Sequence, residues 1–285
     1  MRTHPATNAA AFVVGVAVVF AGAAGIGRAV GPTSSSSNPR DSGHPMPTKT
    51  AGDPVTQAPG GVQVSDRGYT VQMPELTLPE GPWSLAATVV DRDGQPVPTF
   101  RAMEGEQLHF VVVRSDLVGY QHLHPRRNAA GAWAAPVDLA PGTYRLQAQF
   151  QPVHDDDAVT LGTNFIVSGS VHPGLLPSPS MTDYPDGGYE ADLEGSLRAG
   201  VVSRLTVDAR RAGTVATDPE PYLVGSGHLV VLRFGDLASL RIHPVGNGRH
   251  FDVEVPSAGT YRIFFDFVDR GRTVTAAFTA VADGS

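Results

Sequence analysis

The chain has 285 residues, of which 41% are hydrophobic and 17% charged, and it carries a formal net charge of −7 with no cysteine. The lack of cysteine excludes a disulfide framework, thiolate zinc sites, iron–sulfur clusters and a cysteine nucleophile. An acidic balance without a basic block argues against a nucleic-acid partner. The length is enough for about two domains.

The first segment, residues 1–30, contains a long apolar run. Nineteen residues from Ala9 to Gly27 carry no charge, with Arg2 before them and Arg28 directly after. As a helix this run would reach roughly 28 Å, close to the about 30 Å of a bilayer core. We therefore expect a signal anchor that leaves the rest of a single-pass chain on the extracytoplasmic side. The small residues Ala21-Gly22-Ala23 keep a cleaved signal peptide, and hence a secreted protein, as the alternative.

Residues 31–68 are rich in serine, proline and glycine and lack an apolar period. Such a composition cannot bury enough surface to offset chain entropy, so we expect a disordered linker. A second proline-rich stretch, residues 169–187, separates the two remaining parts of the chain and is interpreted as a connector. These parts are residues 69–168 and 188–285.

The two parts repeat one another. Gly142-Thr143-Tyr144-Arg145 recurs identically at residues 259–262, and Leu123-His124-Pro125 recurs as Ile242-His243-Pro244. The segment 109–114 has a similar counterpart at 228–233. This match and the match of Leu123 with Ile242 are both spaced by 119 residues. Ordered matches at nearly constant spacing indicate two tandem copies of one domain.

Each copy shows the pattern of β-strands. Tyr144, Leu146, Ala148 and Phe150 alternate with polar residues, a period of two that indicates a strand with one buried face. Pro141-Gly142-Thr143-Tyr144, like Ala258-Gly259-Thr260-Tyr261, resembles a tyrosine corner, in which the tyrosine hydroxyl bonds back to the backbone. We predict an all-β chain of two tandem immunoglobulin-like β-sandwich domains, preceded by the N-terminal hydrophobic helix and the linker.

Histidines form the most informative polar pattern in the first copy. If residues 108–114 and 120–124 pair as a symmetric hairpin, His109 lies opposite His124 and Val111 lies opposite His122. Opposed residues have Cβ atoms about 4.5–5.5 Å apart, and residues two apart share a face. Neutral imidazoles gathered in this way are suitable ligands for copper or zinc. The sequence therefore predicts a metal site of His109, His122 and His124.

The second copy predicts a separate site. The same register places His228 opposite His243, and Asp266 lies on the outer face of the strand that begins at Tyr261. We expect His228, His243 and Asp266 to form this second site, in which Arg241 stands where the first copy has His122. A structural role, with the imidazoles bonded to backbone, is the competing interpretation of both histidine sets.

At the His-x-His-Pro and Pro-Gly-Thr-Tyr-Arg motifs the chain resembles membrane-anchored extracytoplasmic proteins of actinobacteria described as heavy-metal-binding-domain or YtkA-like proteins. CopC-like copper-binding sandwiches are more distant relatives of these. The segments that carry the resemblance are His109–Pro125, Pro141–Phe150, His228–Pro244 and Gly259–Phe267. It implies a β-sandwich and copper handling.

We therefore expect a non-enzymatic extracytoplasmic metal-binding protein that handles copper, with zinc as the other candidate metal. Its expected partners are the membrane and a metal-trafficking or cell-envelope protein. The alternative is a membrane-tethered structural or protein-binding module without metal. An enzyme is disfavoured because no G-x-S-x-G elbow occurs and no glutamate follows His122 and His124 as a cupin would need. The acidic turn of residues 154–157 is expected to be a solvated loop.

Overall fold

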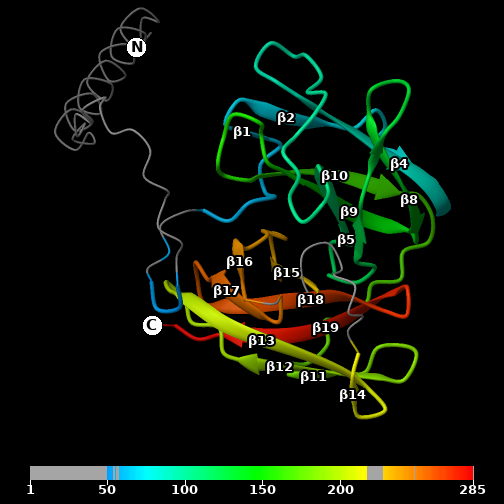
Figure 1. Cartoon of the computed structure of the whole chain (residues 1–285). Helices are drawn as coiled ribbons and strands as arrows, with labels where there is room; N and C mark the ends of the chain where they lie inside the picture. Colours follow the sequence, from blue (N-terminus) through cyan, green and yellow to red (C-terminus); the bar gives the residue numbers. More distant parts are fainter. Residues whose placement is uncertain (1–49, 54, 56–57, 217–226, 247, 285) are drawn as a thin grey trace, which may run out of the picture. The chain divides into compact units, whose positions relative to one another are not determined.

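The computed structural model describes residues 50–53, 55, 58–216, 227–246 and 248–284. Every regular element in these residues is a β-strand, so the described chain is all-β, as predicted (Figure 1). No helix in this part of the chain is long and apolar enough to cross a membrane. The predicted N-terminal helix and residues 31–49 of the predicted linker lie outside the described residues. Residues 65–66 of that linker form a short strand.

The first repeat consists of two sheets, coloured cyan to green in Figure 1. One sheet has the order β1 (Ser65–Asp66), β2 (Tyr69–Gln72), β4 (Gly81–Val90), β8 (Trp133–Leu139) and β7 (Arg126–Arg127). The other has the order β3 (Thr77–Leu78), β10 (Val159–Val167), β9 (Gly142–Phe150), β5 (Leu108–Arg114) and β6 (Gln121–Leu123). Their inner faces enclose one core, which includes Leu85, Phe110, Leu146 and Phe150.

The second repeat, coloured yellow-green to red in Figure 1, also has two sheets. One has the order β11 (Thr182–Asp183), β12 (Tyr189–Gly195), β13 (Val202–Arg211), β17 (His250–Glu254) and β16 (Ile242–Val245), and β14 (Thr214–Val215) also pairs with β13. The other has the order β15 (His228–Arg233), β18 (Gly259–Asp269) and β19 (Arg272–Ala282). Their shared core includes Leu205, Phe251, Ile263 and Phe278.

The alternation seen in the sequence is confirmed. Tyr144, Leu146, Ala148 and Phe150 are all buried in the first core. The tyrosine corners form as well: the Tyr261 hydroxyl donates to the Ser257 carbonyl at 2.7 Å, and the Tyr144 hydroxyl bonds the backbone of Ala140. These bonds anchor the start of β9 and β18, which neighbour β5 and β15 in their sheets.

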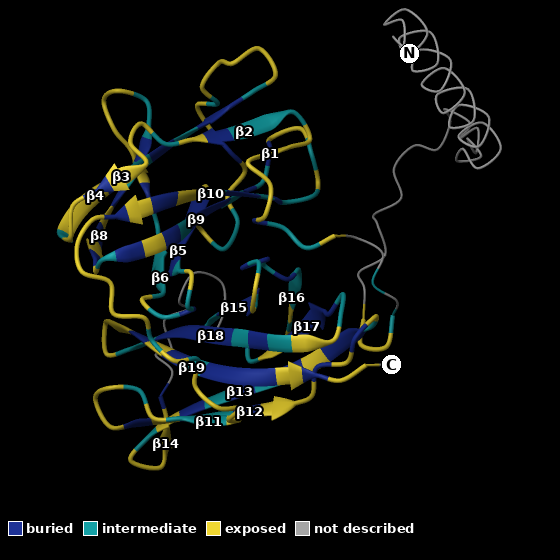
Figure 2. Cartoon of the chain, turned by 180° about the vertical axis from the view of Figure 1, so that it is seen from behind, coloured by how far each residue is buried: buried dark blue, intermediate teal, exposed yellow. Residues whose placement is uncertain are grey.

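The outer face of β5 is buried too, which the alternation does not predict. A third apolar cluster joins Val111 and Val113 of the first repeat to Val230, Leu232 and Phe264 of the second. Burial on both faces explains why residues 110–113 and 229–232 are apolar without interruption. In Figure 2 much of β18 and β19 is likewise coloured as buried.

The second-copy hairpin differs from the prediction. Leu232 bridges Ser239 and the Leu240 amide donates to the Val231 carbonyl, both in the expected register. The chain then leaves β15, and β16 pairs with β17 of the other sheet, with His243 opposite Asp252. The predicted pairing of His228 with His243 is therefore wrong. In the first repeat the same change of sheet comes later, after His124, where β7 pairs with β8.

Candidate metal site

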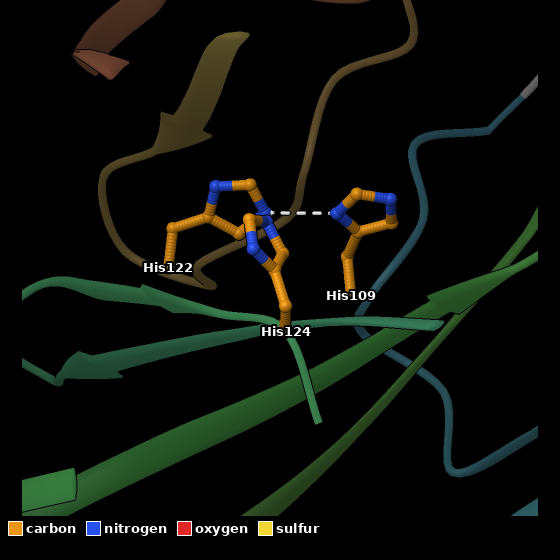
Figure 3. Close-up of side chains that lie close together, drawn as sticks. All are labelled: His109, His122 and His124. Atoms are coloured by element: carbon orange, nitrogen blue, oxygen red, sulfur yellow. Dashed lines mark hydrogen bonds between the residues drawn. The ribbon is translucent and has the colours of Figure 1, made fainter. Parts of the chain in front are cut away.

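The first-copy histidines occupy the positions that the hairpin register predicts. Val111 pairs with His122 and Phe110 with Leu123, while His124 follows directly after β6. His109 shares the outer face of β5 with Val111. One ring nitrogen from each of His109, His122 and His124 lies within 4.8 Å of the others. Figure 3 shows the three rings gathered on one side of the strands.

Hydrogen bonding fixes the protonation of His109. Its Nε2 lies 3.0 Å from the Met103 carbonyl oxygen, which can only accept, so Nε2 carries the proton. The neutral ring then has its lone pair on Nδ1. This Nδ1 lies 3.0 Å from Nε2 of His122, as the dashed line in Figure 3 marks.

The protonation of His122 is directed from the opposite side. Its Nδ1 contacts Oδ2 of Asp266 at 3.2 Å, and a carboxylate favours the proton on the nitrogen that faces it. Nε2 of His122 then also carries a lone pair. In this tautomer a cation between the two facing nitrogens would be bound by both lone pairs. In the other tautomer of His122, its Nε2 donates a hydrogen bond to Nδ1 of His109 over the same 3.0 Å.

The second repeat supplies Asp266 and His228 to this cluster, rather than forming a separate site. The two residues are directly opposite in β18 and β15, and Asp266 is 2% exposed. Asp266 Oδ2 also accepts the Tyr120 hydroxyl at 2.8 Å, and Oδ1 accepts the hydroxyl of Thr275. The ring of His228 stacks on those of His122 and His109, with centroid distances of 4.4 and 5.7 Å.

Glu104 completes the cluster and was not identified from the sequence. It precedes β5 and bonds Nδ1 of His228. Its backbone is in the left-handed region with φ of 51°, which costs energy for a residue with a side chain. His109 and His124 recur in the second copy as His228 and His243, whereas position 223, 119 residues after Glu104, is leucine. The duplication therefore gave no signal for Glu104.

Burial keeps the three first-copy imidazoles neutral. Desolvation, together with the charge of neighbouring histidines, lowers the pKa of His109 to about 3 and that of His124 to about 4. The pKa of His122 is also lowered, because burial outweighs the opposing effect of Asp266. Neutral imidazoles are the form that binds a metal, so all three are ready to coordinate at neutral pH.

The two carboxylates and His228 remain suited to the charged form. Burial alone would raise the pKa of Asp266 and of Glu104, but hydrogen bonds and histidine charge lower both overall. Burial likewise disfavours the His228 cation, yet the bond to Glu104 and its charge raise the pKa of His228. The site thus pairs three neutral ligands with nearby negative charge.

Other predicted polar groups do not join this cluster. Nε2 of His243 lies 3.0 Å from Oε1 of Glu254, so its partner is in its own sheet. In the acidic turn, Asp155, Asp156 and Asp157 form ion pairs with Arg67, Arg101 and Arg241, respectively. These arginine partners explain the turn without a bound cation.

The spacing of the His109 and His122 nitrogens is that of two ligands on one metal ion. Two nitrogens bound to one ion at about 2.0–2.1 Å, with about 90–110° between the bonds, lie roughly 2.8–3.4 Å apart. The 3.0 Å between His109 Nδ1 and His122 Nε2 falls in that interval. Asp266 and Met103 orient the two rings through their other nitrogens, as carboxylates and carbonyls do around metal-bound histidines.

A family profile described as "Domain of unknown function (DUF8832)" matches residues 63–168 and 182–284. No curated protein sequence matches the chain.

Three of the solved structures that match are distantly similar. A mutant of Salmonella alpha-2-macroglobulin is 12% identical over 79% of this chain, with a TM-score of 0.26, and this chain spans 15% of its length. Extracellular domains 3–5 of Drosophila OTK are 12% identical over 80% of this chain and 68% of theirs, with a TM-score of 0.20. A chimeric titin Z1Z2 is 15% identical over 76% of this chain and 96% of its own, with a TM-score of 0.20. Scores at this level carry no information about function.

Proposed function

The chain belongs to the DUF8832 family, whose function is unknown, and we propose that it is a non-enzymatic metal-binding protein. One observation carries this proposal. Nδ1 of His109 and Nε2 of His122 face each other at 3.0 Å while the other nitrogen of each ring is directed to an acceptor. Together with His124, these rings offer three neutral ring nitrogens within 4.8 Å of one another.

Copper(II) is the metal that these ligands favour. Imidazole nitrogen is a good ligand for copper and zinc, and a site without strong geometric selection binds copper(II) more tightly than zinc(II). The absence of cysteine removes the thiolates that would favour other soft-metal centres. Zinc(II) is the second candidate, with a lower affinity.

We propose that the protein is located on the extracytoplasmic side of the membrane. Its support is the apolar run of residues 9–27, which suits a signal anchor, and the resemblance of the histidine motifs to heavy-metal-binding-domain proteins. In this account the two repeats are immunoglobulin-like sandwiches that bind copper for transfer to a metal-trafficking or cell-envelope protein.

A second candidate function is purely structural, and a specific observation favours it as well. Polar groups bond the two repeats to each other directly: Tyr120 to Asp266, Glu104 to His228, and Gln147 to the Leu237 carbonyl at 2.5 Å. Such bonds can hold two domains in one arrangement without metal. This module would be a rigid spacer or a protein-binding surface.

Calorimetric titration of the full chain with copper(II) and zinc(II) separates the two functions. We expect one copper ion per chain with sub-micromolar affinity, and a loss of about 100-fold or more in His109→Ala. His243→Ala is the matched control, since His243 lies in another sheet, and it should bind as the wild type does. No binding by the wild type, or equal loss in both variants, would support the structural module instead.

A further inference from the structure

The imidazoles of the cluster and the carboxylate that orients one of them belong to different repeats. His109, His122 and His124 come from the first repeat, whereas Asp266 and His228 come from the second. Asp266 reaches across the junction, with its Oδ2 3.2 Å from Nδ1 of His122. If the two repeats moved apart, the three imidazoles would stay together but the carboxylate would leave them. The arrangement of the repeats therefore determines whether a bound ion lies near Asp266.

Without an ion, negative charge at this junction is only partly compensated. Asp266 and Glu104 are two carboxylates, and a protonated His228 offsets one of them. Hydrogen bonds from Tyr120 and Thr275 stabilise Asp266 but bring no charge. A buried charge without an opposite charge costs free energy. A divalent cation at the imidazoles supplies that opposite charge, so it favours the arrangement in which Asp266 is close.

Elsewhere the junction between the repeats is packed less well than either core. The apolar cluster that joins the repeats has fewer members than the two cores. A space of about 70 Å³ remains between the repeats, lined by Val111 and Gln147 of the first and Val230 of the second, among others. Oε1 of Gln147 is buried and has no hydrogen-bond partner among the described residues. Voids and unpaired buried polar atoms both weaken a contact, so we expect the chain to open here first.

The connector is suited to be the hinge of such an opening. Its residues 170–179 contain no strand. It is attached where the Gly174 amide donates to Asp116 at 2.7 Å and where Leu176 packs on the apolar cluster between the repeats. Asp116 follows the end of β5, whereas His109 lies near the start of this strand. A rotation about the connector therefore opens the junction at the histidine end.

Two neighbouring glycines at the histidine end are bonded to different repeats. Gly60 exchanges backbone hydrogen bonds of 3.0 and 2.9 Å with Ser239 of the second repeat, and the Gly61 amide donates to the Thr160 carbonyl of the first at 2.8 Å. Thr160 and Ser239 line the same space as Glu104. Because neighbouring Cα atoms are only about 3.8 Å apart, the repeats cannot separate at this point unless one set of bonds breaks. Exchange of these amides therefore reports the opening.

We propose that the bound ion holds the two repeats in the closed arrangement seen in the structure, so that metal binding and closure around Asp266 are one linked equilibrium. This inference rests on the proposed metal-binding function and adds to it the control of the repeat arrangement by metal. Linkage is reciprocal: the factor by which closure raises metal affinity is the factor by which the ion favours closure. Orientation of a ligand histidine by a carboxylate changes affinity by about 10- to 100-fold, so the ion should favour closure by about that factor.

Hydrogen exchange of the full chain at pH 7, read by mass spectrometry with and without excess copper(II), tests this. In the wild type, copper should slow exchange of peptides containing Gly60, Gly61 and Ser239 by about 10- to 100-fold. Asp266→Asn should still bind one ion, but copper should slow its exchange by less than about twofold. Asp252→Asn is the matched control, because this buried carboxylate pairs with Arg204 in another sheet, and copper should slow its exchange as in the wild type.

A second variant guards against misfolding of Asp266→Asn. His122→Ala removes the imidazole that Asp266 orients, so copper held at saturation by the remaining histidines should also slow exchange by less than about twofold. If calorimetry detects no copper binding to the wild type, the proposed function fails. If copper binds but exchange in the wild type does not slow, or slows equally in the folded Asp266→Asn and His122→Ala variants, the linkage between binding and closure is wrong.

Discussion

Two facing nitrogens, Nδ1 of His109 and Nε2 of His122, decide what the site can do. The Met103 carbonyl and the Asp266 carboxylate direct the ring protons away from the 3.0 Å gap between them. Such direction from outside sets the tautomer and raises the basicity of a ligand nitrogen. The chemistry of the site therefore depends on residues that never touch the ion.

Asp266 is the residue through which this dependence can be measured. Asp266→Asn keeps the shape but loses the charge that orients His122, so copper(II) affinity should fall by about 10- to 100-fold with one ion still bound per chain. Asp252→Asn is the control, because Asp252 is also a buried carboxylate but pairs with Arg204 in another sheet. Calorimetry on both variants checks this. An unchanged affinity in Asp266→Asn would contradict the orienting role.

Acid should destabilise the metal-free protein. His109 has a pKa of about 3 when folded and His124 of about 4, against about 6.5 when unfolded. Between these values the unfolded chain binds more protons, so stability falls as the pH drops from 6.5 towards 3. His109 alone should lower the free energy of unfolding by about 2 kcal/mol at pH 5. His228, with a raised pKa, acts oppositely, and its contribution is lost as the pH rises above 6.5.

Urea unfolding at pH 7 and pH 5 measures this loss. His109→Gln should lose less stability between the two pH values than the wild type, because glutamine does not titrate. An equal loss in both proteins would show that His109 is not buried in its neutral form.

At the scale of elements, the hairpin of the first repeat was predictable and that of the second was not. Strand length and the short connection set the register that pairs Val111 with His122. The second hairpin begins in the same register but changes sheet after Leu240. Pro244 lacks an amide proton and so weakens any ladder it joins, but the choice between two neighbouring sheets depends on long-range packing. Local sequence does not contain that information.

The outer faces of β5 and β15 provide an element-scale prediction. Leu232 is fully buried in the cluster that joins the two repeats. Leu232→Ala should lower the free energy of unfolding by about 2–5 kcal/mol, as for other core leucines. Val215→Ala, at a position 48% exposed, should change it by less than about 0.5 kcal/mol. Denaturant titration measures both, and a small effect at Leu232 would mean that these faces are not packed together in solution.

For the molecule as a whole, duplication predicted two similar halves but not that one site draws on both. The all-β class, the tyrosine corners and the first three histidines followed from periodicity and repeats. The contribution of Asp266 to the first-copy cluster did not, because two copies analysed separately suggest two sites. The uninterrupted apolar run of residues 110–113 was the available signal, since a strand buried on both faces needs a second layer. Glu104 had no such signal.

Pulsed electron paramagnetic resonance of the full chain loaded with one equivalent of copper(II) tests the central claim most directly, because it counts the imidazoles bound to the ion. The account predicts three coordinated imidazoles in the wild type and a reduced number in His122→Ala, with no change in His243→Ala. A wild-type spectrum with no imidazole or one, or a spectrum that His122→Ala leaves unchanged, would contradict it.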